Sequence, residues 1–150
     1  MIAKAWFVRS AVLLAMAFSP LAMATNAITV YHDPACGCCV AWISYLRAQG
    51  YTVTAHKDQS MATVKTRLGV PPDAASCHTA LIDGYVIEGH VPVEDIRRLL
   101  AEHPDARGLA APGMPMGSPG MEMGKPERYY VVFIEQDGSS RVFATHGPKA

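Results

Sequence analysis

The sequence lacks an excess of charge of either sign. Its 150 residues include 13 basic and 13 acidic side chains. A nucleic-acid-binding protein usually carries a basic patch, and a protein that binds a membrane surface often carries a polybasic segment. The composition therefore predicts neither a nucleic-acid partner nor electrostatic attachment to a membrane.

Long hydrophobic runs are also missing. The most apolar stretch, residues 11–18, is shorter than the roughly 20 residues that a helix needs to cross a bilayer. It follows Lys4 and Arg9 and precedes the small residues Ala22 and Ala24, a pattern typical of a secretory signal peptide. We therefore predict a signal peptide at residues 1–24 and a periplasmic mature protein without a membrane anchor. Removing Lys4 and Arg9 leaves 11 basic against 13 acidic residues, a net charge of about −2.

Cysteine is scarce but concentrated. Three of the four cysteines, Cys36, Cys38 and Cys39, lie in the segment "YHDPACGCCV", and the fourth is Cys77. The two well-separated C-x-x-C pairs of a structural zinc site are absent. The predicted mature chain is long enough to bury a core without disulfides, which weakens a purely structural role. In an oxidising compartment, such cysteines are paired, used in thiol exchange or protected by a metal.

The hydrophobic pattern predicts an α/β fold. Alternating apolar residues indicate strands, and the Asp83-Gly84 pair between two of them indicates a tight hairpin. Apolar positions at helical spacing, here Cys39, Trp42, Ile43 and Leu46, indicate a buried helix face. The predicted elements are strand 27–31, a helix from the cysteine run to Gly50, strand 51–57, helix 61–68, strands 78–82 and 85–89, and a helix that starts at Pro92. This order, β-α-β-α-β-β-α, is the thioredoxin-like layout, in which a crossover helix joins a parallel strand pair.

The C-terminal third departs from this layout. Ten of the 23 residues from 104 to 126 are glycine or proline, so we predict a loop without regular structure there. The segments "YYVVFIEQ" and "SSRVFATH" flank Asp137-Gly138 and predict an additional hairpin. The predicted organisation is a signal peptide at 1–24, a thioredoxin-like metal-binding domain at 25–103, a Met-rich Pro/Gly loop at 104–126, and a C-terminal hairpin at 127–150 packed on the same domain.

The three clustered cysteines fall where the first strand leads into the first helix. A helix N-terminus stabilises a thiolate, which is both a nucleophile and a metal ligand, so this position alone does not separate redox chemistry from metal binding. Cys77 stands just before the third predicted strand, where thioredoxins carry a cis-proline that faces the C-x-x-C. We therefore expect a fourth sulfur close to the other three.

The spacing of the cysteines bears on the metal. Consecutive residues on a helix project about 100° apart, so Cys38 and Cys39 do not easily enter one relaxed tetrahedral shell with Cys36 and Cys77. Several metal ions bridged by sulfur suit this crowding better. Soft thiolates favour Cu(I), zinc or iron–sulfur clusters, and in the absence of the usual zinc pattern the argument favours copper.

Methionine offers a second soft ligand. Met114, Met116, Met121 and Met123 all lie in the segment "GMPMGSPGMEMG". Thioether binds Cu(I) and stays usable under oxidising conditions, and a flexible loop with M-x-M spacing can fold round one ion. The alternative interpretation is an apolar loop that packs on the domain.

Two histidines are candidate ligands. His32 ends the first strand and His78 adjoins Cys77, so both are placed to reach the cysteines, and imidazole suits copper. His90 is a weaker candidate because it lies at the far end of the second hairpin strand. The other histidines, His56, His103 and His146, are predicted to be surface residues.

With these residues in hand, the sequence resembles the CopG-like family of small periplasmic proteins, a domain of unknown function often encoded with bacterial copper-resistance systems. The matching pieces are "DPACGCC", "SCHTALIDGYVIEGHVP" and "GLAAPGMPMGSPGMEMG". The resemblance implies a thioredoxin-like fold, a multinuclear copper site held mainly by cysteine thiolates, and a role in copper redox conversion during resistance. Carried over by position, the thiolates are Cys36, Cys38, Cys39 and Cys77.

The leading hypothesis is a periplasmic protein that binds several Cu(I) ions through the four cysteines, cycles copper between Cu(I) and Cu(II), and works with other copper-resistance proteins. One alternative is a thiol–disulfide oxidoreductase with Cys36 as nucleophile and Cys39 as resolving residue. The other is a pair of structural disulfides, for which four cysteines allow three pairings.

Overall fold

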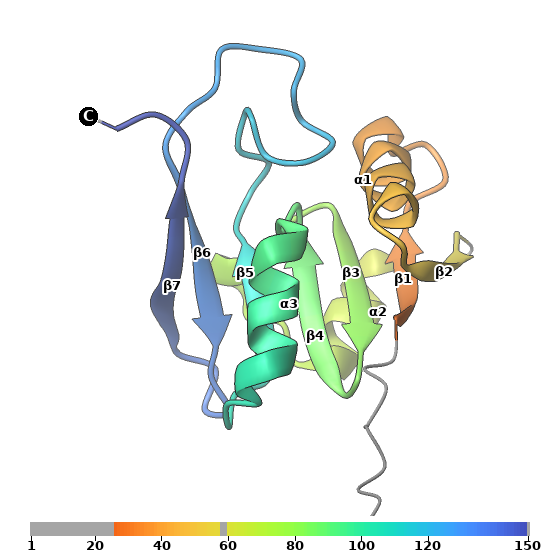
Figure 1. The fold of residues 1–150 in the computed structure, drawn as a ribbon. Coiled ribbons are helices and arrows are strands. Elements are labelled where there is room, and N and C mark those ends of the chain that lie inside the picture. The colour runs from red at the N-terminus through yellow and green to blue at the C-terminus, as the bar shows by residue number, and fades with distance from the viewer. Residues whose placement is uncertain (1–25, 58–59, 150) are drawn as a thin grey trace, which may run out of the picture.

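A single seven-stranded sheet with helices on both faces makes up the fold (Figure 1). The computed structural model describes residues 26–57 and 60–149, so the predicted signal peptide at 1–24 lies outside it. The strands are β1 (Ala27–His32), β2 (Thr52–His56), β3 (His78–Ile82), β4 (Tyr85–Gly89), β5 (Gly108–Ala111), β6 (Tyr129–Ile134) and β7 (Ser140–His146). The helices are α1 (Gly37–Ala48), α2 (Met61–Leu68) and α3 (Val93–Glu102), with a short 3-10 helix at Pro72–Ala74.

The first four strands and three helices have the predicted thioredoxin-like layout. The strand order is β2-β1-β3-β4-β5-β6-β7. Strand β1 is parallel to β2 and antiparallel to β3, and β3 and β4 form the predicted antiparallel hairpin. Figure 1 shows α3 in front of the sheet and α2 behind it. The predicted α/β fold class and element order are therefore confirmed.

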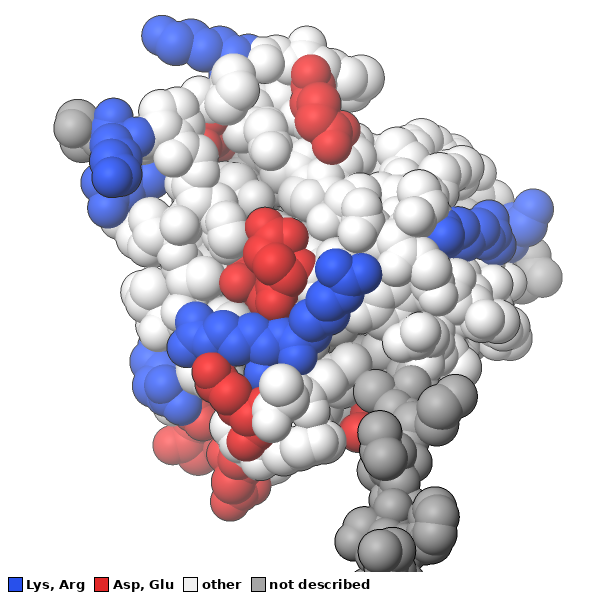
Figure 2. All heavy atoms as spheres, in the orientation of Figure 1, with Lys and Arg blue, Asp and Glu red and all other residues white. Residues whose placement is uncertain are grey.

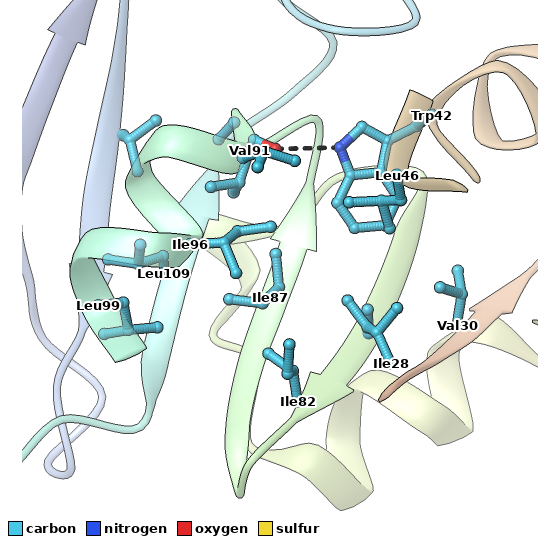
Figure 3. Close-up of a cluster of buried hydrophobic side chains, with 14 of the residues drawn as sticks. Ile28, Val30, Trp42, Leu46, Ile82, Ile87, Val91, Ile96, Leu99 and Leu109 are labelled. Atoms are coloured by element: carbon cyan, nitrogen blue, oxygen red, sulfur yellow. Dashed lines mark hydrogen bonds between the residues drawn. The ribbon is translucent and has the colours of Figure 1, made fainter. Parts of the chain in front are cut away.

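The larger part of the core lies between the sheet and the face that α1 and α3 cover (Figure 3). Cys39, Trp42 and Leu46 of α1 are completely buried, and Ile43 is almost so, which confirms the predicted helix face. The Trp42 indole Nε1 donates a hydrogen bond of 3.0 Å to the carbonyl of Val91. This bond ties the helix that carries the cysteines to the segment that follows β4. A smaller cluster under α2 includes Val70, Ala74, Val86, Ala110 and Ile134.

The loop prediction for residues 104–126 is wrong at one place. Strand β5 forms there, fully buried, and pairs in parallel with β4. The short sequence Gly-Leu-Ala-Ala forms a strand although glycine and proline are frequent around it. Position 108 requires glycine, because a Cβ there would overlap the carbonyl of Val86. Strand β5 then pairs with β6, so the C-terminal hairpin extends the main sheet. The predicted β6–β7 hairpin is confirmed, with a bulge between Val131 and Val132.

Charge is scattered over the surface that covers α1 and α3. Figure 2 shows basic and acidic side chains beside one another at the lower left of this face, and mostly uncharged surface with a few single charges over the rest. Among the described residues, no helix combines the length and the apolar character that spanning a bilayer requires.

Candidate metal centre

The turn after β1 places three cysteines at the N-terminus of α1. The Asp33 carboxylate Oδ1 accepts the backbone N–H of Ala35 at 2.7 Å, which closes a tight turn. Cys36 is the N-cap of the helix, and its Sγ accepts the backbone N–H of Cys39 at 3.3 Å. A side chain that accepts from the third helical residue is the usual N-cap arrangement, here made by sulfur.

All four cysteine sulfurs lie together. The Cys36 and Cys38 Sγ atoms are 3.4 Å apart, and the Cys38 and Cys77 Sγ atoms are 3.8 Å apart. Every pair of the four lies within 4.8 Å. Cys77 reaches the trio because β3 is the neighbour of β1 in the sheet, and both the end of β1 and the start of β3 face α1. The expected proximity of the fourth sulfur is present in the structure, while metal binding by these residues stays a prediction.

The four cysteines differ in oxidation state. Cys36 and Cys39 are joined by a disulfide, whereas Cys38 and Cys77 are free and half-buried. The chain thus forms one disulfide, in the C-x-x-C, and not the two that the purely structural interpretation requires. In this state two thiols are available, and reduction of Cys36–Cys39 by two electrons would supply the other two.

The Cys77 thiol is held in its protonated form. Burial, and after it the neighbouring Cys38 sulfur, raises the pKa of Cys77 to about 11. At neutral pH the thiol therefore keeps its proton until a metal ion or a base displaces it.

Two buried histidines lie next to the Cys77 sulfur. The His78 Nδ1 lies 3.3 Å from the Cys77 Sγ, and the His90 Nε2 lies 3.2 Å from the same sulfur. Both side chains are fully buried, and their rings meet edge to face with centroids 4.9 Å apart. Burial lowers the pKa of His78 well below its usual range, with His90 as the next cause, and burial also lowers the pKa of His90. Each imidazole is therefore neutral and has a nitrogen lone pair available.

His90 was predicted to be a weaker candidate than His32, but the structure places His90, and not His32, among the ligand atoms around Cys77. The two-residue turn at Asp83-Gly84 could have predicted this position of His90, because the turn sets the register of the hairpin. Thr79 pairs with Glu88, and counting outward from the turn places Cys77 opposite His90. His90 lies at the end of the strand in sequence but next to the start of the hairpin in space.

His32 takes a different position. It is buried, its Nδ1 donates to the carbonyl of Asp33 at 2.9 Å, and it lies opposite His78 in the β1–β3 register. Directly opposed residues share a face of the sheet, so the His32 side chain lies on the same face as that of His78. Among the described residues, the ligand atoms that gather within 4.8 Å do not include those of His32.

Comparisons with known proteins show which family the chain is similar to. A family model described as "Protein of unknown function, DUF411" matches residues 74–121, which include Cys77 and His90. Two solved structures, titled copper resistance protein CopG, forms 1 and 2, are each 50% identical to this chain. They cover 80% of this chain and 96% and 97% of their own, with TM-scores of 0.75 and 0.76. The chain belongs to the CopG-like family. No curated protein is a significant match to it.

The four loop methionines of this CopG-like chain differ in exposure. Met114, Met116 and Met123 have exposed side chains, whereas Met121 is buried with 6% of its surface accessible. Burial of Met121 fits the packing interpretation, and the other three remain available to solvent.

The loop that carries them nevertheless touches the centre through its backbone. Figure 1 shows this segment, between β5 and β6, reaching over the top of the sheet towards α1. A Cβ at Gly120 would lie 2.9 Å from the backbone nitrogen of Trp42 and 3.1 Å from the carbonyl of Cys38, and Gly120 has a φ of +86°. Only glycine fits this contact without strain.

A network of buried polar groups around Glu88 holds the backbone next to Cys77. The Glu88 carboxylate is completely buried and accepts hydrogen bonds from the backbone N–H of Ser76 at 2.7 Å and the Thr79 hydroxyl at 2.6 Å. It also forms an ion pair with Lys65. Burial raises the pKa of Glu88, and Lys65 opposes this shift. Because Ser76 precedes Cys77, the network fixes the backbone that presents the fourth sulfur.

Proposed function

We propose that this chain is a periplasmic copper-binding protein of copper resistance, which holds Cu(I) at Cys36, Cys38, Cys39 and Cys77. The observation that carries the proposal is the convergence of four sulfurs within 4.8 Å of one another. Thiolates are soft ligands that prefer Cu(I) among the abundant metal ions, and the half-identical relatives are titled copper resistance proteins. The predicted signal peptide supports the periplasmic location.

The density of sulfur supports binding of more than one ion. Cys38 and Cys39 are adjacent in sequence, and the Cys38 sulfur lies 3.4 Å from that of Cys36 and 3.8 Å from that of Cys77. A thiolate with two thiolates this close can bridge metal ions. His78, and after it His32, would supply nitrogen ligands at the edge of this set.

Copper loading is expected to depend on the oxidation state of the protein. A disulfide sulfur carries no thiolate charge, so the four-thiolate site exists only after Cys36–Cys39 has accepted two electrons. We also propose that copper cycles at this site: two Cu(I) ions that become Cu(II) supply the two electrons that reduce the Cys36–Cys39 disulfide to two thiolates, and the reverse reaction reforms the disulfide.

The exposed methionines fit a role in copper transfer. Met114, Met116 and Met123 present thioethers to solvent on a loop that contacts the cysteine helix. A weak, soft ligand on an exposed loop can accept Cu(I) from another periplasmic copper-resistance protein, or pass it on, with few bonds to break.

One observation favours a second candidate function. The Cys36–Cys39 disulfide is the pair that a thiol–disulfide oxidoreductase would use, with Cys36 as nucleophile. Against it, the free Cys38 sulfur lies 3.4 Å from Cys36 and invites non-productive pairing. Cys77 also stands where a thioredoxin holds its substrate peptide.

Anaerobic copper titration separates the two functions. The reduced protein is titrated with Cu(I) against a chromophoric chelator, and we expect more than one equivalent to bind, with most lost in Cys38→Ser and Cys77→Ser. Val40→Ser, a half-exposed control on the same helix, should leave the stoichiometry unchanged. Binding of no copper by the reduced protein, together with insulin reduction that survives Cys38→Ser, would reject the copper function in favour of thiol exchange.

A further inference from the structure

A small pocket lies at the end of α1 that is farther from the cysteines. Helix α1 has 12 residues, so its two ends are about 18 Å apart. The pocket has a volume of about 230 Å³, which is below the roughly 300 to 1,000 Å³ of sites that hold drug-sized ligands. Its size therefore suits a small molecule. The residues that line it are Asn26, Gln49, Tyr51, Arg97, Leu100 and Ala101.

The one cation in the lining has no acidic partner. The next arginine along α3, Arg98, forms an ion pair with Glu102 at 2.7 Å. Among residues 26–57 and 60–149, no carboxylate forms an ion pair with Arg97. The Arg97 Nη2 donates to the backbone carbonyl of Gln49 at 3.1 Å, which holds the guanidinium at the end of α1. A guanidinium has five N–H donors, so this bond leaves donors free for an anion.

Tyr51 adds a second donor beside the first. Its side chain lines the pocket, although only 7% of the residue is exposed. Burial raises the pKa of the Tyr51 hydroxyl, and the adjacent Arg97 opposes this shift, so the hydroxyl is protonated at neutral pH. The Tyr85 hydroxyl donates to the carbonyl of Pro104 at 2.9 Å, whereas that of Tyr51 donates to no described residue. An O–H and a guanidinium side by side therefore lack an acceptor.

The remaining lining is uncharged. Leu100 and Ala101 are apolar, and Asn26 and Gln49 carry neutral amides. A single guanidinium compensates one negative charge, and its planar fork matches the two oxygens of a carboxylate. Apolar side chains next to the fork favour a ligand that has a hydrocarbon stem. The lining thus favours a monoanionic carboxylate with a short stem over a dianion such as phosphate.

We propose that this pocket binds a small aliphatic carboxylate, with Arg97 and Tyr51 as donors to the carboxylate and Leu100 beside the stem. None of these residues belongs to the cysteine centre, which lies at the other end of α1. The proposal therefore adds a second ligand to the copper function and does not depend on it.

An NMR titration of the copper-free protein tests the pocket. The probes are butyrate, acetate, phosphate and n-butylammonium, which has the stem of butyrate with the opposite charge. We expect butyrate to shift the backbone amides of Gly50, Tyr51 and Ala101 and to saturate in the millimolar range. Acetate and phosphate should each bind several-fold more weakly, because acetate lacks the stem and phosphate carries excess charge. Butylammonium should not bind.

Two pairs of matched variants test the donors. Arg97→Gln should weaken butyrate binding about tenfold or more, because it removes charged hydrogen bonds, whereas Arg98→Gln, next to it on α3, should not. Tyr51→Phe keeps the buried ring and should weaken binding several-fold. Tyr130→Phe, at a half-exposed position on β6, should leave it unchanged.

Three results would overturn the proposal. They are the absence of a saturable shift with butyrate, equal shifts with butyrate and butylammonium, and an unchanged butyrate affinity in Arg97→Gln. Tighter binding of phosphate than of butyrate would replace the carboxylate by a phosphate ligand and so reject the proposed class. The Cu(I) stoichiometry is measured separately, so failure of this pocket and failure of the copper function are distinguishable.

Discussion

The two halves of the sheet bury different kinds of side chain. Strands β1, β3 and β4 bury polar and charged residues as well as apolar ones, whereas the described buried side chains of β5, β6 and β7 are all aliphatic or aromatic. The polar ones are His32, His78, Thr79 and Glu88, with His90 just after β4. The apolar ones are Leu109, Ala110, Ala111, Tyr129, Val131, Phe133, Ile134 and Phe143.

The difference teaches how this fold holds a reactive centre. Burying an imidazole or a carboxylate destabilises the fold unless every polar atom has a hydrogen-bond partner. Burying an aromatic side chain stabilises the fold. The polar half positions sulfur and nitrogen, and the apolar half, which the basic thioredoxin-like layout does not include, adds packed surface. The comparison predicts that mutations in the two halves affect different measurements.

The largest effect on stability is expected in the apolar half. Phe133 is 4% exposed and packs edge to face on Phe143 with ring centroids 4.7 Å apart. Phe133→Ala should lower the free energy of unfolding by about 3 to 4 kcal/mol, measured by urea denaturation, because it removes a buried ring and leaves a cavity. Its folded fraction should bind as much copper as the wild type. Val142→Ala on the exposed face of β7 is the control, with a change within about 0.5 kcal/mol. Loss of copper in folded Phe133→Ala would mean that the two halves are not separable.

A change in the polar half should affect both measurements. Glu88→Gln removes the charge that pairs with Lys65, so we expect a loss of about 3 kcal/mol in unfolding free energy. The same variant loosens Ser76 and should weaken copper binding several-fold in the chelator assay. Glu102→Gln removes an exposed pair with Arg98 and should cost at most about 0.5 kcal/mol. An unchanged copper affinity in Glu88→Gln would show that the network serves stability alone.

The smallest stability effect is expected in the loop between β5 and β6. Met123 is 84% exposed, so Met123→Leu should change the unfolding free energy by no more than about 0.5 kcal/mol. If the exposed thioethers capture Cu(I), the rate of copper uptake in stopped-flow should fall a few-fold while the final stoichiometry stays the same. Met121→Leu, at a buried position, is the matched control and should leave the rate unchanged. Equal rates in all three proteins would assign the loop to packing.

Most of the fold could be predicted because its signals are local. The apolar stripe of α1 and the Asp83-Gly84 and Asp137-Gly138 turns depend on neighbouring residues, and each predicted element formed. Strand β5 could not be predicted in this way. Its four residues carry no alternation and lie among glycines and prolines, and it forms because the edge of β4 offers a parallel partner.

The centre was predictable to the same extent. The three cysteines at the start of α1 follow from the strand-to-helix pattern, and the thioredoxin-like layout placed Cys77 beside them. His90 needed the hairpin register, and its hydrogen bond from Nδ1 to the Pro119 carbonyl needed the path of a loop that has no periodicity. The sequence pattern also gave equal weight to four methionines, of which the structure buries one.

The sequence by itself determined the order of the elements, the clustering of sulfur at the start of α1 and the soft character of the donors, because these depend on residue type and short spacing. Only the tertiary structure decided which cysteines pair, which histidine nitrogens face Cys77, and that the Met-rich loop supports His90. The contacts of Cys77 with His90, of His90 with Pro119 and of Cys38 with Cys77 join residues 13, 29 and 39 positions apart. At that separation the arrangement is set by packing of the whole sheet, and no local pattern specifies it.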